Sequence, residues 1–215
     1  MSDKRLIPAD PERGWGQLLP LYFKEGVRVA NHAVNGRSSK SFLEEGKWEV
    51  VRLKLQPADY VIIQFGSNDE HQDNPKQYTA PFGEFKTNLL RYVRETRVRR
   101  ALPILATPVP RRSFTAAGKL RDTHGDYSVA VRQVAAEEQV PLLDLDRRCS
   151  EALAQLGPEG SKRWYDWIPP GEFEKRPEGS SDNSHFCAYG ATRACDFAVD
   201  EMRTATPELA RWLRR

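Results

Sequence analysis

Short apolar-rich runs alternate along the chain with longer segments in which apolar residues recur every three or four positions. The runs cover residues 27–34, 60–65, 102–109 and 140–145, and runs of this length are typical of strands buried in a parallel sheet. The helical spacing covers residues 15–23, 38–45, 47–55, 82–96, 127–139, 148–156 and 189–203. This alternation predicts an α/β domain whose parallel sheet carries helices on both faces.

Two segments follow neither pattern and are predicted to be loops. Residues 70–81 are rich in Asp, Asn, Gln and Pro, and residues 161–181 hold Trp164, Tyr165, Trp167 and several prolines. A loop as long as the second is usually functional or disordered. No internal repeat, low-complexity tract or linker divides the 215 residues, so we predict one domain over residues 1–215.

Polar turn residues follow the first two predicted strands. Asn35 and Gly36 come after residues 27–34, and Gly66-Ser67-Asn68-Asp69 comes after residues 60–65. Ligands of parallel sheets bind at the carboxyl ends of the strands, so both turns are expected at a ligand-binding edge. Each also has an ordinary explanation, because Gly and Asn are common turn residues.

Near the C-terminal end, Asp182 lies three residues before His185, and a segment with helical spacing follows. A carboxylate in this position can accept the proton of imidazole Nδ1 and leave Nε2 free to act as a base. An isolated Asp-x-x-His pair is more often a helix cap next to a packed histidine. The two turns described above make the acid–base interpretation the favoured one here.

Five segments together resemble the SGNH (GDSL-type) hydrolases, and within them the rhamnogalacturonan acetylesterase-like carbohydrate esterases. The matching segments are Arg13-Gly14-Trp15-Gly16-Gln17, residues 31–41, Gln64-Phe65-Gly66-Ser67-Asn68-Asp69, Thr107-Pro108-Val109-Pro110-Arg111-Arg112 and Asp182-Asn183-Ser184-His185-Phe186. The resemblance implies a three-layer α/β/α, flavodoxin-like parallel sheet. It also implies that Asp182 and His185 are the acid and base of a triad, and that Gly36 N–H and the Asn68 side chain form the oxyanion hole. No cofactor is implied.

The nucleophile of the family is a serine in a Gly-Asp-Ser turn at the end of the first strand, before the segment that matches Arg13-Gly14-Trp15-Gly16. Residues 1–12 contain neither that turn nor an apolar strand. We therefore expect the first, inner strand to be missing and the nucleophile to lie upstream of Met1. A chain without that strand is expected to be insoluble, partly unfolded and inactive, because its neighbours lose their backbone partners.

Other nucleophiles are less favoured. Ser38 and Ser67 are the serines nearest the expected site, but Ser67 directly precedes Asn68 and would replace a group carried by a different strand. The family commonly has another polar residue where Ser67 stands. Cys187 lies two residues after His185, and residues so close along a chain rarely face each other for attack.

Composition excludes several classes of function. Hydrophobic residues make up 39% and charged residues 29%, with a net charge of +3, as in ordinary globular proteins. The cluster Arg94, Arg97, Arg99 and Arg100 falls at a predicted helix end, where cations complement the macrodipole, so no nucleic-acid binding is predicted. Neither the histidines nor the three cysteines have metal-ligand spacing. We predict no metal and reduced cysteines in the core.

No run of eighteen apolar residues and no apolar leader segment is present, so we predict no membrane insertion. As written, the sequence predicts a cytoplasmic protein, and a secreted one if a signal peptide preceded it. The sequence leaves the oligomeric state open.

The expected substrate is an acetylated oligosaccharide. Trp164 and Trp167 would stack on sugar rings or cover the sheet edge, and Arg111, followed by Arg112, would hold a uronate or lie in a solvated loop. Of the other histidines, His32 is predicted in the core, and His71 and His124 at the surface.

The predicted function is a serine esterase that deacetylates rhamnogalacturonan or related pectic oligosaccharides. Two alternatives remain: an inactive glycan-binding or interaction protein on the same scaffold, and a lipase or thioesterase of the same superfamily.

Overall fold

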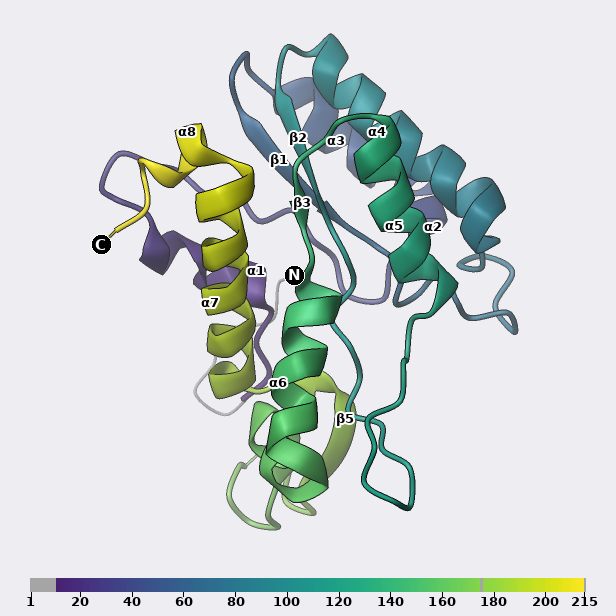
Figure 1. Ribbon diagram of the computed structural model, residues 1–215, viewed down its shortest axis with the longest axis vertical. Helices are drawn as coiled ribbons and strands as arrows, with labels where there is room; N and C mark the ends of the chain where they lie inside the picture. Colours follow the sequence, from purple (N-terminus) through teal and green to yellow (C-terminus); the bar gives the residue numbers. More distant parts are fainter. Residues whose placement is uncertain (1–10, 175, 215) are drawn as a thin grey trace.

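A computed structural model describes residues 11–174 and 176–214. In this part of the chain the central sheet contains strands β1 (Tyr60–Gln64), β2 (Leu102–Ala106) and β3 (Leu142–Leu143), all parallel, in the order β1-β2-β3 (Figure 1). Tyr60 pairs with Leu102, and Leu105 pairs with Leu142. The β-branched residues of β1 favour the strand conformation, and the predicted parallel α/β sheet is confirmed.

Helices cover both faces of the sheet (Figure 1). One face packs against α1 (Trp15–Leu18), α6 (Leu145–Gly160) and α7 (Ala188–Ala205), and the other against α2 (Ser39–Glu44), α3 (Lys47–Lys54), α4 (Lys86–Val98) and α5 (Asp126–Glu137). Strand β2 shows the two layers, since Ile104 joins the first core and Leu105 the second, as side-chain alternation requires. The shorter helices are η1 (Leu19–Tyr22), η2 (Pro81–Phe85), η3 (Ser161–Trp164) and α8 (Pro207–Ala210).

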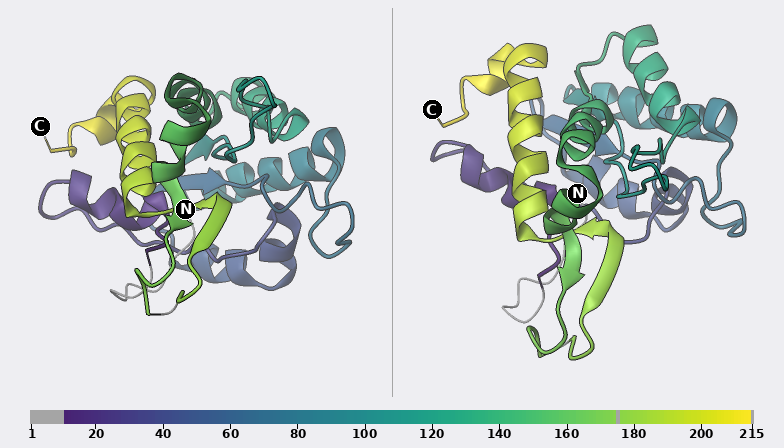
Figure 2. Two further views of the ribbon diagram at one scale, coloured as in Figure 1. Left: turned by 90° about the horizontal axis from the view of Figure 1, so that it is seen from below. Right: turned by 60° about the horizontal axis from the view of Figure 1, so that its bottom comes forward.

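The predicted long loop at residues 161–181 is wrong in part. Within it begins an antiparallel hairpin of β4 (Tyr165–Ile168) and β5 (Ser180–Phe186), which projects beyond the sheet in Figure 2. Asp182 and His185 therefore lie on a strand, and α7 begins after them, at Ala188. Aromatic and β-branched residues in β4 favour pairing, a local signal that the prolines of the connecting segment obscured.

The predicted strand at residues 27–34 is also wrong. Val27 and Val29 are partly buried while Arg28 and Ala30 are exposed, so the strand-like alternation is present, but no ladder forms. A strand needs a neighbour to satisfy its backbone N–H and C=O groups, and none of the described strands pairs with this segment.

Two of the three cysteines, Cys149 and Cys195, are fully buried as predicted, whereas Cys187 is partly exposed. Among the described residues, no helix combines the length and the hydropathy needed to span a bilayer.

The start of α7 packs directly on the chain that precedes the hairpin. A Cβ atom built on Gly190 would lie 1.9 Å from the carbonyl oxygen of Trp164. The same carbonyl accepts a hydrogen bond of 3.1 Å from Cys187 N–H. Only glycine allows this approach, which fixes the strand carrying His185 against its neighbour.

We expect Gly190→Ala to lower the free energy of unfolding by about 2 kcal/mol because the methyl group overlaps a backbone oxygen. Helix propensity alone predicts the opposite sign. Gly160→Ala is the matched control, since its Cβ would make ordinary contacts with the Leu156 side chain, at 3.5 Å from Cβ and 3.8 Å from Cδ2, and it should be neutral or stabilising by at most about 1 kcal/mol. Urea denaturation measures both, and equal effects would contradict this account of α7.

Candidate active site

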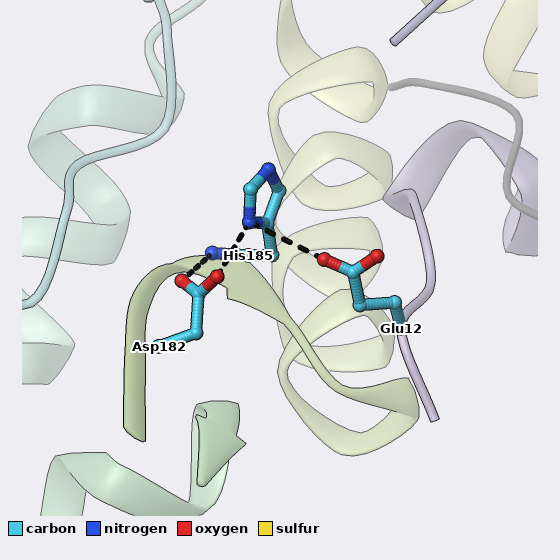
Figure 3. A group of neighbouring side chains, drawn as sticks. All are labelled: Glu12, Asp182 and His185. Carbon is cyan, nitrogen blue, oxygen red and sulfur yellow. Dashed lines mark hydrogen bonds and ion pairs between the residues drawn. The ribbon is translucent and has the colours of Figure 1, made fainter. Parts of the chain in front are cut away.

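Asp182 and His185 contact each other within strand β5 (Figure 3). His185 Nδ1 lies 2.8 Å from Asp182 Oδ2, and Asp182 Oδ1 accepts hydrogen bonds from the backbone N–H groups of Ser184 and His185 at 2.5 and 2.9 Å. A carboxylate next to Nδ1 favours the tautomer with the proton on Nδ1, which leaves the lone pair on Nε2. Nε2 points away from the carboxylate and has no hydrogen-bond partner among the described residues.

The electrostatics favour an ionised Asp182. Burial acts to raise the pKa of Asp182, but hydrogen bonds from the His185 ring and from the N–H groups of Ser184 and His185 outweigh it and hold the pKa below its ordinary value. The imidazole side chain is 43% exposed, so its free nitrogen is accessible to a reacting group. Asp182 and His185 thus have the geometry of an acid–base pair.

A second carboxylate approaches the same imidazole nitrogen. Glu12 Oε1 lies 3.3 Å from His185 Nδ1, and one ligand atom each from Glu12, Asp182 and His185 gather within 4.8 Å of one another. This cluster has the composition of a cation site, but its nitrogen already faces Asp182 as a proton donor. Sequence reasoning missed Glu12, which lies in a polar segment without periodicity and far from His185 along the chain.

The two predicted turns come together around Asp69, a buried carboxylate. Asp69 accepts hydrogen bonds from Ser39 N at 3.0 Å, Thr79 Oγ1 at 2.9 Å and Gly66 N at 3.1 Å. Ser39 Oγ also donates to it, at 2.5 Å. Burial raises the pKa of Asp69, and the hydrogen bonds from Ser39, Thr79 and Gly66 oppose that rise. Asp69 therefore joins the turn after β1 to the start of α2.

Gly36 and Asn68 lie on the two segments that Asp69 joins. Asn68 Nδ2 donates to Arg37 O at 3.2 Å, and Gln77 Nε2 donates to Gly36 O at 2.6 Å. Gly36 has a φ of 71°, in the left-handed region that favours glycine. Its N–H has no acceptor among the described residues, and Asn68 keeps a second amide hydrogen. Both groups thus have a donor available for an oxyanion.

The loop after β2 links these turns to the hairpin. Arg111 Nη2 donates to Ser67 O at 2.9 Å. Arg112 donates to Asn183 twice, from its backbone N to Asn183 O and from Nη1 to Asn183 Oδ1, both at 2.8 Å. Arg111 is also paired with Glu70. The loop therefore connects the neighbours of Asn68 and of Asp182. Because the Arg111 guanidinium already has protein partners, its binding of a uronate stays a prediction.

Trp164 does not have the predicted sugar-binding position. It is only 2% exposed, with its ring against Phe186 and Phe197, so it belongs to the core beside α7. Trp167 is partly exposed. Its ring centroid lies 4.4 Å from Lys162 Nζ and 4.9 Å from Arg112 Cζ, and its contact with sugar stays a prediction.

The surface prediction for His124 is wrong. Its imidazole is buried. Nδ1 lies 3.2 Å from Glu70 Oε2, on the loop after β1, and Nε2 lies 2.7 Å from Val109 O, on the loop after β2. His124 therefore links these two loops through hydrogen bonds. His71 is exposed as predicted, and His32 lies partly buried outside any strand.

None of the alternative nucleophiles, Ser38, Ser67 and Cys187, forms a hydrogen bond with His185. Ser38 is buried and caps α2 through Ser41 N–H, and Cys187 Sγ donates to Arg163 O at 3.1 Å. Among the described residues, no hydroxyl or thiol forms a hydrogen bond with His185.

Comparisons with known proteins find a matching family, similar sequences and a similar fold. The sequence profile of the GDSL-like Lipase/Acylhydrolase family matches residues 4–188. Rhamnogalacturonan acetylesterase RhgT of Bacillus subtilis is 38% identical over 190 residues, which cover 88% of this chain and 80% of the relative. The probable rhamnogalacturonan acetylesterase YesY of the same species is 36% identical over 178 residues, covering 83% and 77%. The crystal structure of Bacillus subtilis YxiM superposes with a TM-score of 0.72 at 26% identity, covering 92% of this chain and 52% of that one.

We expect Asp69→Asn to lower the free energy of unfolding by about 3 kcal/mol, because an amide nitrogen would face hydrogen-bond donors in a buried position. Asp73→Asn is the control, since Asp73 is exposed on the loop that follows, and it should change the free energy by less than about 0.5 kcal/mol. Equilibrium denaturation at neutral pH measures both variants. A stability of Asp69→Asn equal to that of the parent would show that Asp69 does not join the two turns.

Proposed function

Because the chain belongs to the GDSL-like Lipase/Acylhydrolase family, we propose that it is an esterase that removes acetyl groups from rhamnogalacturonan or a related pectic oligosaccharide. The observation that carries the proposal is the contact of 2.8 Å between Asp182 and His185, with Nε2 accessible and without a partner among the described residues. The names of the two relatives supply the substrate class.

In this proposal His185 is the general base. The nucleophilic serine is not identified among the described residues. In the proposal its Oγ attacks the acetyl carbonyl carbon while its proton passes to His185 Nε2, and Asp182 stabilises the imidazolium through Nδ1–H. The tetrahedral intermediate carries its negative charge on the former carbonyl oxygen. Gly36 N–H and Asn68 Nδ2 donate to that oxygen.

The intermediate then collapses to the acetyl-enzyme. His185 returns the proton to the departing sugar oxygen, so the sugar leaves as an alcohol. Water, deprotonated by the same Nε2, attacks the acetyl-serine, and acetate and the free serine are released. Asp182 keeps the ring in the required tautomer through both halves of the reaction.

The surroundings of the hairpin support an acidic carbohydrate substrate. Lys162 and Arg112 lie against the ring of Trp167, and Trp167 Nε1 donates to Asn183 Oδ1 at 3.0 Å. Asn183 is the residue after Asp182, so an aromatic ring with two cations adjoins the acid–base pair. Both cations also have protein partners, Glu159 for Lys162, and Asn183 and Pro158 O for Arg112. Aromatic rings contact sugar faces and cations attract uronate groups. A lipase or thioesterase of the same family would differ in substrate alone.

We expect His185→Ala to lower kcat/KM for acetate release from acetylated rhamnogalacturonan by about a thousandfold or more, because the general base is lost. His71→Ala is the matched control, since His71 is exposed on the polar loop after β1, and it should leave the rate unchanged. An enzymatic acetate assay measures both variants. Full activity in His185→Ala would exclude the assigned base.

A second candidate function is glycan binding without catalysis. It is favoured by one observation, that no described hydroxyl forms a hydrogen bond with His185. A fluorophosphonate probe followed by peptide mass spectrometry separates the two functions. A labelled serine identifies the nucleophile and supports the esterase, whereas oligosaccharide binding without labelling and without acetate release supports the binding protein.

A further inference from the structure

The imidazole of His185 faces two carboxylates through one nitrogen (Figure 3). Nδ1 lies 2.8 Å from Asp182 Oδ2 and 3.3 Å from Glu12 Oε1. Asp182 accepts the single proton of Nδ1 as a hydrogen bond, and Glu12 Oε1 lies at ion-pair distance from the same nitrogen. The acid–base chemistry assigned above uses only Asp182 and leaves Glu12 without a role.

Glu12 is held beside His185 by the backbone. It forms an antiparallel bridge with Cys187, and Arg13 N–H donates to Phe186 O at 3.0 Å. The segment that carries Glu12 thus lies along the residues that directly follow His185. Only 14% of the Glu12 side chain is exposed. The position of Glu12 relative to the imidazole is therefore set by backbone pairing as well as by the attraction between the side chains.

The charged groups around the imidazole come from three other elements. Glu12 Oε2 lies 3.8 Å from the Arg176 guanidinium, so the two oxygens of Glu12 face different partners. Arg176 in turn pairs with Asp166 of β4, whose side chain is buried. Burial raises the pKa of Asp166, and Arg176 opposes that rise. Arg13 Nη1 donates to the carbonyl oxygen of Glu12. The remaining charged neighbour, Asp182, lies on the same strand as His185, β5.

We propose that Glu12 is a positioning residue that acts with Asp182 to keep the Nδ1 proton of His185 in place and so to hold the ring with Nε2 directed away from both carboxylates. The inference rests on the proposed function in one respect, that His185 is the base. Negative charge near an imidazole favours its protonated form. A second carboxylate also limits rotation of a ring that is 43% exposed, because turning the ring would break two contacts instead of one.

A structural role for Glu12 makes a different prediction. If Glu12 served only to pair with Arg176, its replacement would change stability and leave the proton equilibrium of His185 unaltered. Glu12→Gln separates the two cases, because the amide keeps the size and an acceptor oxygen but removes the charge. Glu12→Asp keeps the charge on a shorter side chain.

The first experiment is an NMR titration of the histidine ring protons in the folded protein. Its four histidines are distinguished by the signal that disappears in His185→Ala. We expect Glu12→Gln to lower the titration midpoint of His185, by a modest amount because solvent screens the exposed ring. Asp182→Asn should lower it further, Glu12→Asp should lower it less than Glu12→Gln, and the midpoints of the other three histidines should stay unchanged.

Glu159→Gln is the matched control. Glu159 is 82% exposed and pairs with Lys162, so its loss of charge should leave the midpoint of His185 where it is. A folded Glu12→Gln protein with an unchanged His185 midpoint would overturn the proposal, as would an equal shift in Glu159→Gln.

The second experiment follows acetate release against pH. The acidic limb of kcat/KM should move to lower pH in Glu12→Gln by the same amount as the NMR midpoint, with KM unchanged and a loss of only a few-fold at the pH optimum. An unmoved limb in an active variant would overturn the proposal. The NMR titration needs no catalysis, so failure of the proposed function would appear as absent acetate release with the NMR shift intact.

Discussion

A buried carboxylate, Asp69, determines how the ligand-binding edge of this sheet is built. A charge removed from water is tolerated only when its oxygens are fully hydrogen-bonded. Ser39 and Thr79 provide donors from segments far from Asp69 in the sequence, and Gly66 provides one from its own turn. Satisfying this one group therefore fixes three segments against each other. Gly36 and Asn68 lie on two of those three segments, and Asn68 Nδ2 donates to the carbonyl oxygen of Arg37, the residue after Gly36.

The remaining parts of the site are attached to this edge by further polar contacts. The buried imidazole of His124 joins the loops after β1 and β2 through Glu70 and Val109. Arg112 then joins the loop after β2 to Asn183 on the hairpin. These contacts couple a rigid parallel sheet to a hairpin outside it. The proposed base is therefore carried by a different part of the fold from the proposed oxyanion donors, and their relative placement depends on the arginines between them.

The hairpin has its own supports. Glycine at position 190 lets α7 approach Trp164 closely, and an isolated bridge pairs Glu12 with Cys187, the residue after β5. The charges of Glu12, Arg176 and Asp166 continue inward from His185. An imidazole surrounded in this way is oriented by groups on several elements. Its chemistry is a property of the folded hairpin more than of the Asp-x-x-His segment alone.

Local features of this protein were predictable from its sequence, and features that depend on distant partners were not. The apolar run of β1 and the helical spacing of α4 specify their elements through side-chain periodicity. The contact between Asp182 and His185 spans only three residues, and it is supported locally because the N–H groups of Ser184 and His185 both donate to Asp182 Oδ1. The strand expected at residues 27–34 needed a neighbour that the pattern could not supply. The burial of Trp164 and His124, and the approach of Glu12 to His185, join residues far apart in the chain. Tertiary structure alone decides such contacts, because packing and burial, which depend on the whole chain, select which polar groups must meet.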